Sequence, residues 1–379
     1  MRIRNVGVVC GKRTPVGVIG GALRQVPSPL LLSSVISAVL GGVPLSLISS
    51  AVFGCSLQGN LGINPVKQAL SLSKVENIPS YLINTGHSGG LDSVLLACQS
   101  IQMGEDLVLC GGFDSSSNCP HSIQGRNSWK SGENVKDELQ MAYYTSKGMH
   151  YGLALEELIV KLQISRRSQE SYAAHAQKRR KIALKTGVFE KEIQGLEVLN
   201  EDELVFYPEN QNFKPIFYST GSISAVCTAW PSDGAVALLL GSLSTIQKFH
   251  LSCLASVSAV WKANLTDISF YTTVETGVKK ILNLFGLAIH NIDLWEINDF
   301  FALIPTVLCE KLGIDLEKVN ITGGNLSIGD TFSASSARSV LTASLQMELR
   351  QAEFSVLISL NCSNEVVIVL LRSSNLTHN

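Results

Sequence analysis

The chain has few charged residues and almost no net charge. Asp, Glu, Lys and Arg together make up 16% of its 379 residues, and the formal net charge is −1. Proteins that bind nucleic acid usually carry a clear excess of positive charge, so we expect no nucleic-acid partner. A low charged fraction is also typical of chains that bury much of their surface against another subunit. We therefore expect a homodimer or a homotetramer.

The sequence lacks the paired cysteine and histidine spacings of disulfide frameworks and metal sites. Its nine cysteines are an odd number, and none of them forms a Cys-x-x-Cys pair. This usage is typical of a reducing compartment and predicts neither a structural disulfide nor a bound metal.

Long apolar runs are also missing. No stretch approaches the roughly 20 apolar residues that a membrane-spanning helix needs. A strand-like run begins at Val6 and leaves no room for a secretory or transit segment before it. We expect a cytoplasmic protein without a membrane span, although residence in an organelle stays open.

What the chain does contain is an alternation of short apolar runs with helical patterns. Such runs, bounded by glycine or polar residues, predict buried strands at 6–10, 51–54, 107–111, 235–240, 292–297, 319–321, 354–360 and 366–371. The alternation predicts a layered α/β fold. The chain is longer than one core usually supports, so we expect at least two domains or an internal duplication.

The segment between residues 118 and 225 has a different composition from the rest of the chain. It is more polar and more charged, and it includes a long helical pattern from 165 to 186 with Ser165 as the predicted N-cap. We interpret this segment as an insertion in the first half of the fold.

Residues 83–112 have the layout of a reactive turn, in which a strand ends, a glycine-rich turn follows and an apolar helix begins. His87 lies at the centre of the turn, beside Gly86, Gly89 and Gly90. The first N–H groups of a helix lack intrahelical partners, and we expect them to form a donor site for a developing oxyanion. Residues 321–347 run through a similar glycine turn into a helix, which indicates a pseudo-repeat.

The same stretch resembles the nucleophile segment of the thiolase superfamily. Similarity continues in the order of that family through further blocks at 13–23, 62–69, 150–179, 232–240, 295–302 and 319–338. The resemblance implies the thiolase fold, with two similar βαβαβαββ halves in a five-layered α-β-α-β-α arrangement and an inserted loop domain. It places the first half at 1–117, completed by 226–246, the loop domain at 118–225 and the second half at 247–379.

The resemblance also identifies four positions of the family's catalytic site, most of them substituted here. His87 stands where the family has its acylated cysteine, and Asp330 stands where it has its catalytic histidine. Leu360 aligns with the acid/base cysteine of the Cys-x-Gly motif, although a shift of two residues would restore a thiol from Cys362. Asn298 matches the family's asparagine, which holds a water in one oxyanion hole.

Further positions align with the substrate site of the family. His150 matches a loop-domain histidine near the acyl pocket, and Ala229 stands where a serine commonly contacts the pantetheine. Gly329 matches the glycine before the catalytic histidine, and Cys362 the glycine of the Cys-x-Gly motif. His87 either fills the space of the lost cysteine or keeps an acid/base role at the oxyanion hole.

These substitutions predict a thiolase-like protein without normal thiolytic or condensing activity. An acyl-imidazole on His87 would hydrolyse readily, whereas a cysteine forms the thioester that thiolases use. We expect no resident cofactor and consider a coenzyme A thioester the possible ligand. Two alternatives stay open, namely an active acyl-CoA acyltransferase and an acyl-CoA decarboxylase or hydrolase of altered chemistry.

Overall fold

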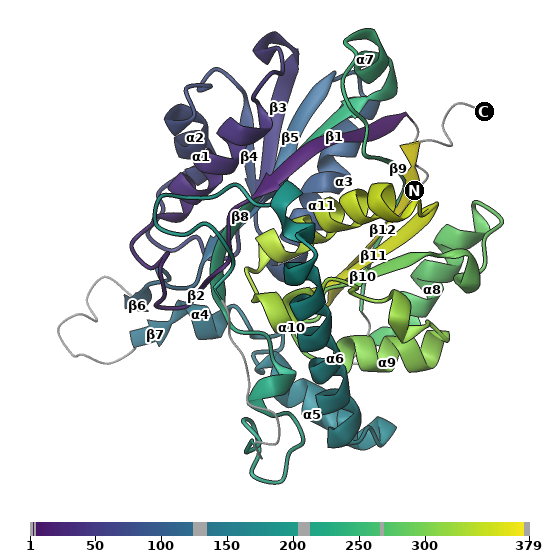
Figure 1. The fold of residues 1–379 in the computed structure, drawn as a ribbon. Coiled ribbons are helices and arrows are strands. Elements are labelled where there is room, and N and C mark those ends of the chain that lie inside the picture. Colours follow the sequence, from purple (N-terminus) through teal and green to yellow (C-terminus); the bar gives the residue numbers. More distant parts are fainter. Residues whose placement is uncertain (1–2, 4, 124–134, 204–212, 266–268, 375–379) are drawn as a thin grey trace.

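A computed structural model describes residues 3, 5–123, 135–203, 213–265 and 269–374. Its centre is one mixed sheet with the strand order β10-β11-β12-β9-β1-β8-β5-β3-β4, and β2 (Gly17–Val18) pairs with β8 (Figure 1). The other strands are β1 (Val6–Arg13), β3 (Ile48–Gly54), β4 (Ser80–Ile83), β5 (Leu107–Ser115), β8 (Ser232–Ser242), β9 (Ala255–Asn264), β10 (Leu294–Ile297), β11 (Phe354–Leu360) and β12 (Glu365–Ser373).

The sheet consists of two halves with the same pattern of strand directions. In the first half β4, β3 and β5 are parallel, and β8 and β1 follow antiparallel. In the second half β10 and β11 are parallel, and β12 and β9 follow antiparallel. The halves join where β1 pairs with β9 over only two residue pairs. The predicted pair of similar halves is confirmed.

The predicted strand at 319–321 is wrong, so the second half has four strands where the first has five. Val319 makes a single parallel bridge to Trp295. Asn320 then turns into the left-handed region, with φ of 45°, and its side chain bonds both the N–H and the carbonyl of Ile297. A strand cannot continue through that conformation.

Helices form three layers around the two halves of the sheet. In the first half α1 (Ser28–Val39) and α2 (Pro65–Leu72) cover the outer face. In the second half α8 (Phe270–Asn283) and α9 (Leu303–Leu312) do the same. Between the halves lie α3 (Gly89–Gln102) and α11 (Ser333–Arg350), whose apolar residues share one core with strands of both halves (Figure 1). This is the five-layered arrangement that the sequence predicts.

The two central helices approach each other unusually closely at Gly90. A Cβ atom at this position would lie 2.3 Å from the backbone nitrogen of Ala337, so only glycine fits there. The N-terminal turns of α3 and α11 are therefore held side by side.

An excursion between β5 and β8 contains β6 (His121–Ile123), β7 (Val135–Asp137), α4 (Glu138–Met141), α5 (Tyr151–Leu162) and α6 (Arg166–Lys185). The N-cap of α6 is Ser165, whose hydroxyl accepts a hydrogen bond from the N–H of Ser168 at 3.0 Å, as predicted. The limits of the loop domain at 118 and 225 stay a prediction. In the part of the chain that the structure describes, no helix is long and apolar enough to cross a membrane.

Candidate functional site

His87 lies in a short 3₁₀ turn, Gly86–Ser88, between the end of β4 and the start of α3. Its side chain is completely buried. Gly86 has φ of 60°, a backbone conformation that glycine adopts without strain, and it directs the next residue inward. The predicted layout of strand, glycine turn and helix is confirmed for this segment.

The expected free amides at the start of α3 are occupied. The N–H groups of Gly90 and Leu91 donate to the hydroxyl of Ser336 on α11, at 3.0 and 3.4 Å. The expectation of a donor site formed by these amides is therefore wrong for these two groups, because a side chain from the second half satisfies them.

The structure brings His87 and Asp330 together as a buried pair. Nε2 of His87 lies 3.0 Å from an Oδ2 oxygen of Asp330, and neither side chain is exposed. Burial by itself lowers the pKa of an imidazole, but the adjacent Asp330 carboxylate and the sulfur of Cys362 raise the pKa of His87 to about 10. This raised pKa favours the protonated ring at neutral pH.

Asp330 is fixed by hydrogen bonds at both oxygens. Its Oδ1 accepts from the N–H of Phe332 at 3.0 Å and from the Ser335 hydroxyl at 3.1 Å. Its Oδ2, besides facing His87, accepts from the hydroxyl of Tyr143 at 3.3 Å. These bonds fix the orientation of the carboxylate beside His87.

The second nitrogen of His87 faces a thiol. Sγ of Cys362 lies 3.9 Å from Nδ1 of His87, on the turn that follows β11. Leu360, the position aligned with the family's acid/base cysteine, and Cys362 both belong to the hydrophobic core of the second half, but the contact with the imidazole is made by Cys362. The thiol near the centre of the site thus comes from Cys362, two residues later.

Three aromatic rings enclose His87. Phe300 stacks on the imidazole with 4.3 Å between ring centroids, and Phe332 and Tyr143 lie at 4.6 and 5.3 Å. Phe300 lies in the block at 295–302 that resembles the family. Tyr143 and Phe332 were missed, because a lone aromatic residue in a loop or before a helix gives no signal of what it will contact.

Asn298 lies behind His87 with its amide fully engaged. Its Nδ2 donates to the hydroxyl of Ser359 at 3.1 Å and to the main-chain carbonyl of His87 at 3.4 Å. Its Oδ1 accepts from Asn325, whose own oxygen accepts from Arg338 at 2.6 Å. The amide that holds a water in the family site is here part of a protein network.

The remaining predicted residues surround the centre without touching His87. Nδ1 of His150 accepts from the N–H of Gly152 at 3.1 Å and caps α5, its ring stacks on Tyr143, and burial lowers its pKa. Ala229 donates its N–H to the carbonyl of Phe300 at 3.0 Å. Gly329, with φ of 121°, leaves room for the Ser232 hydroxyl. His150 and Ala229 thus contact two of the aromatic residues that enclose His87, Tyr143 and Phe300.

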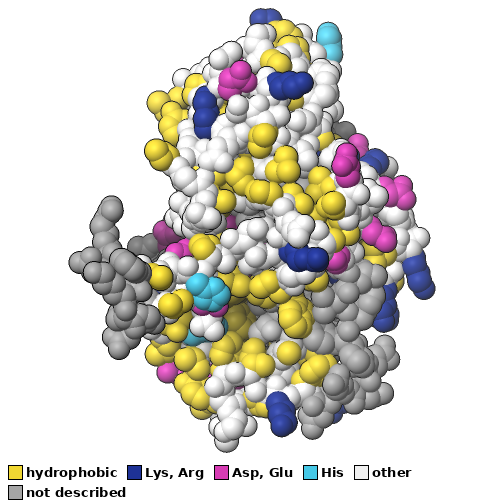
Figure 2. Space-filling view, turned by 90° about the vertical axis from the view of Figure 1, so that its left-hand side faces the viewer, with side chains coloured by type: hydrophobic (Ala, Val, Ile, Leu, Met, Phe, Trp, Pro, Cys, Tyr) yellow, Lys and Arg dark blue, Asp and Glu magenta, His cyan; other side chains and the backbone are white. Residues whose placement is uncertain are grey.

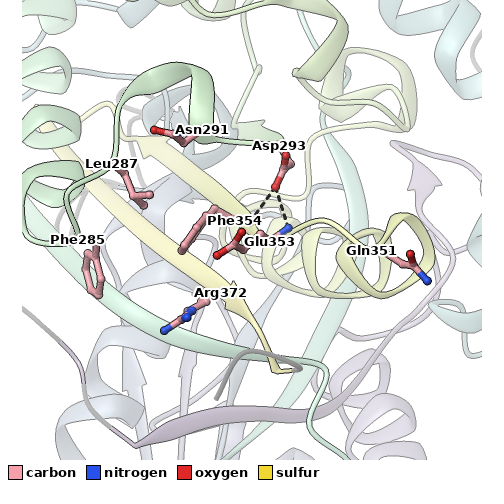
Figure 3. Close-up of a pocket in the computed structure, with 8 residues that line it drawn as sticks. All are labelled: Phe285, Leu287, Asn291, Asp293, Gln351, Glu353, Phe354 and Arg372. Atoms are coloured by element: carbon pink, nitrogen blue, oxygen red, sulfur yellow. Dashed lines mark hydrogen bonds between the residues drawn. The ribbon is translucent and has the colours of Figure 1, made fainter. Parts of the chain in front are cut away.

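A pocket of about 600 Å³ lies elsewhere, at the edge of the second half (Figure 3). It is lined by the segment after α8 and by the ends of β10, β11 and β12. Asp293 on its wall already accepts hydrogen bonds from the N–H groups of Glu353 and Phe354. None of its lining residues is one of the predicted site residues. Within the described residues no cluster of three or more His, Cys, Asp or Glu side chains could hold a metal.

The doubled fold, with two central helices that begin at one buried centre, is that of the thiolases. Human mitochondrial 3-ketoacyl-CoA thiolase in complex with CoA superposes with a TM-score of 0.92 and 26% identity over 98% of each chain. A thiolase from Ascaris suum in complex with coenzyme A gives a TM-score of 0.92 and 27% identity, covering 98% of this chain and 100% of that one.

The sequence agrees with this fold. Residues 6–244 match the family described as Thiolase, N-terminal domain, and residues 251–370 match Thiolase, C-terminal domain. The chain belongs to the thiolase family. Human mitochondrial acetyl-CoA acetyltransferase is 30% identical over 375 residues, which cover 93% of this chain and 86% of that protein. The cytosolic acetyl-CoA acetyltransferase of Rattus norvegicus is 30% identical over 361 residues, with 89% and 90% covered.

Proposed function

We propose that this thiolase-family protein binds a coenzyme A thioester but does not catalyse thiolysis or carbon–carbon condensation at ordinary rates. The observation that carries the proposal is the buried His87–Asp330 pair. It occupies the two positions at which the resemblance places the nucleophilic cysteine and the catalytic histidine.

The chemistry of the pair opposes the family reaction. A protonated imidazole bound to a carboxylate is a poor nucleophile, and its acyl derivative would be lost to water. The Asp330 carboxylate adds negative charge where a thioester oxygen needs a donor. The stacked ring of Phe300 covers the imidazole and leaves it no exposed surface.

Binding of a coenzyme A thioester is supported by the relatives. Two solved thiolases that superpose over 98% of this chain are complexes with CoA or coenzyme A. The ligand is a substrate-like molecule and not a resident cofactor.

We also propose a cytoplasmic homodimer or homotetramer built through the edge of the first half. There β4 ends the sheet, and Tyr81 on this strand is 61% exposed. The face of the molecule that carries α1 and α2 shows many hydrophobic side chains and few charged ones (Figure 2). Light scattering at micromolar concentration should give at least a dimer, and a stable monomer would contradict this assembly.

The activity is tested with acetoacetyl-CoA for thiolysis and acetyl-CoA for condensation. We expect both rates to be absent or lower than those of an ordinary thiolase by on the order of 10³, because loss of members of a catalytic unit costs about that much. Binding is tested separately by the thermal shift with millimolar CoA esters, since a ligand held only by the folded state raises the melting temperature. Ordinary turnover, with host thiolase excluded, would show an active acyltransferase. The absence of any thermal shift would contradict the proposed binding of a coenzyme A thioester.

A further inference from the structure

Three side chains that replace the family's catalytic groups form a continuous chain of contacts. Cys362 Sγ lies 3.9 Å from Nδ1 of His87, and Nε2 of the same ring lies 3.0 Å from Asp330. We propose that Cys362 acts as the nucleophile, His87 as the group that gives and takes the proton, and Asp330 as the orienting carboxylate in the hydrolysis of an acyl thioester. This inference rests on the proposed coenzyme A ester ligand and names the reaction of that site.

The orientation of the imidazole suits this role. Because Asp330 binds Nε2, the opposite nitrogen is directed at the thiol, which is the arrangement by which a third group fixes a base next to its nucleophile. Phe300 and Phe332 hold the ring plane at centroid distances of 4.3 and 4.6 Å. The 3.9 Å contact is long, as catalytic contacts often are before a substrate binds.

All three members of the triad are buried, and Cys362 is the least completely buried of them. The residue keeps 4% of its surface exposed, whereas His87 and Asp330 keep none. The turn that carries it is anchored to the His87 turn, because Asn361 Nδ2 donates to the Thr85 carbonyl at 2.9 Å and to the Ser88 hydroxyl at 3.0 Å. The thiol position is therefore tied to the imidazole position.

Donors for an oxyanion lie next to the sulfur. As far as the described residues go, the main-chain N–H groups of Cys362 and Ser363 donate no hydrogen bond. An N–H of the nucleophile itself, with one from a neighbouring residue, is a known way to bind a tetrahedral oxyanion. The amides around Cys362 replace those at the start of α3, which Ser336 has taken.

The reaction balances with water as its only co-reactant. The Cys362 sulfur attacks the carbonyl carbon while the proton between Sγ and Nδ1 stays on the ring. The carbon–sulfur bond to coenzyme A breaks, and its sulfur takes the proton from His87. Water then attacks the acyl carbon and gives a proton to His87, the bond to Cys362 breaks, and its sulfur recovers a proton. Acyl-CoA and water become a carboxylic acid and coenzyme A.

The site favours hydrolysis over condensation because it contains one thiol where the family has two. In a condensation a second group must remove a proton from the acceptor carbon while the first carries the acyl group. With Cys362 acylated, the second cysteine position is Leu360, which lies in the core. Water needs only the base His87.

The test is covalent labelling of the wild-type protein, followed by variants. The protein is exposed briefly to acetyl-CoA or to p-nitrophenyl acetate, digested and mapped by mass spectrometry, and release of free coenzyme A is followed in parallel. We expect one acetyl group on the peptide that contains Cys362. Cys362→Ser should lower coenzyme A release by on the order of 10³, whereas the matched control Cys309→Ser should leave it unchanged.

Asp330 acts through His87, so its test is a pH profile. Asp330→Asn removes the anion that favours the protonated ring, and the limb of the pH–rate profile that belongs to His87 should move to lower pH. A merely structural role would lower the rate without moving the limb.

The outcomes separate this proposal from the proposed function. A thermal shift with CoA esters and no acetyl group on Cys362 from either reagent overturns the triad and leaves the binding proposal intact. Acetylation of Cys362 by p-nitrophenyl acetate without any thermal shift by CoA esters supports Cys362 as the nucleophile and contradicts the coenzyme A ester as the ligand. Labelling of other cysteines to the same extent as Cys362 also overturns the triad.

Discussion

Each half of the molecule contains a segment that leads through a glycine turn into a central helix. The part of this segment before the helix differs between the two halves, and this is where the site lies. In the first half β4 leads through one short turn into α3, and His87 lies in that turn. In the second half the equivalent strand is reduced to one bridge at Val319. The chain then forms the short helix α10 (Gly324–Ile328), and Asp330 follows before α11 starts.

This difference places opposite charges on equivalent turns. His87 from the first half is a cation, and Asp330 from the second is its carboxylate partner at 3.0 Å. Where the resemblance places a cysteine and a histidine for chemistry, this chain has an ion pair that also joins its two halves. If this pair and the packing around it hold the halves together, substitutions at these contacts should lower the free energy of unfolding.

The largest effect is expected from removing the anion. Asp330→Ala leaves a buried imidazole without its partner, and the loss of one member of a buried pair costs about 3–5 kcal/mol of stability. Urea denaturation measures the change. The matched control is Glu275→Ala, which breaks the exposed Lys279–Glu275 pair of α8 and should cost about 0.2–1 kcal/mol. Equal small losses for both variants would show that the pair does not join the halves.

The pair should also make stability depend on pH on the alkaline side. The pKa of the His87 imidazole is 6.5 in the unfolded chain and about 10 in the folded one. Its contribution to the free energy of unfolding is therefore complete below about pH 6.5. It declines as the pH rises and is gone above about pH 10. Glu296, whose pKa burial raises to about 8, adds a loss of the same sign. We therefore expect wild type to lose more stability from pH 6.5 to 10 than His87→Gln, and parallel curves would exclude the His87 contribution.

A smaller effect is expected where the two central helices approach each other. Gly90→Ala introduces a Cβ atom 2.3 Å from the backbone nitrogen of Ala337, and such overpacking costs about 1–3 kcal/mol. Gly41→Ala is the control, because its nearest contact, with the Ala38 carbonyl, is an ordinary 3.4 Å. Thermal unfolding of both variants gives the comparison. Unchanged stability of Gly90→Ala would mean that the halves separate easily.

The smallest effect concerns the hydroxyl that crosses between the halves. Ser336→Ala removes the acceptor for the N–H groups of Gly90 and Leu91, and loss of such a cap costs about 1 kcal/mol. Ser339→Ala removes only a bond to a carbonyl within α11 and should be nearly neutral. A difference in denaturation midpoint between the two variants is expected, and identical midpoints would argue against capping across the halves.

The sequence predicts most of the scaffold because short, continuous apolar runs mark buried strands. The run at 354–360 coincides with β11, and the N-cap of α6 lies at Ser165. Strand prediction from apolar runs fails where a strand is partly exposed or where a side chain forces the backbone out of the extended conformation. The end of β4 before the glycine turn was expected, but the rest of the strand was not, because its four residues are partly or largely exposed. Asn320 ends a strand that apolar neighbours had predicted.

The sequence predicts the site in part. The positions of His87, Asp330 and Asn298 could be assigned from their motifs, but not the direct contact between residues 87 and 330, which depends on the packing of α3 against α11. The choice between Leu360 and Cys362 could not be made either, because it depends on the turn after β11. Only the structure shows the thiol next to the imidazole.

The shared central layer has a consequence for how the chain folds during synthesis. The helix α3 is synthesised long before its partner α11, because the excursion and most of the second half lie between them in the sequence. Until then the apolar side of α3 and the inner face of the first five strands have no cover. Exposed apolar surface of this kind is prone to aggregation. We therefore expect each half, when expressed without the other, to aggregate rather than to fold.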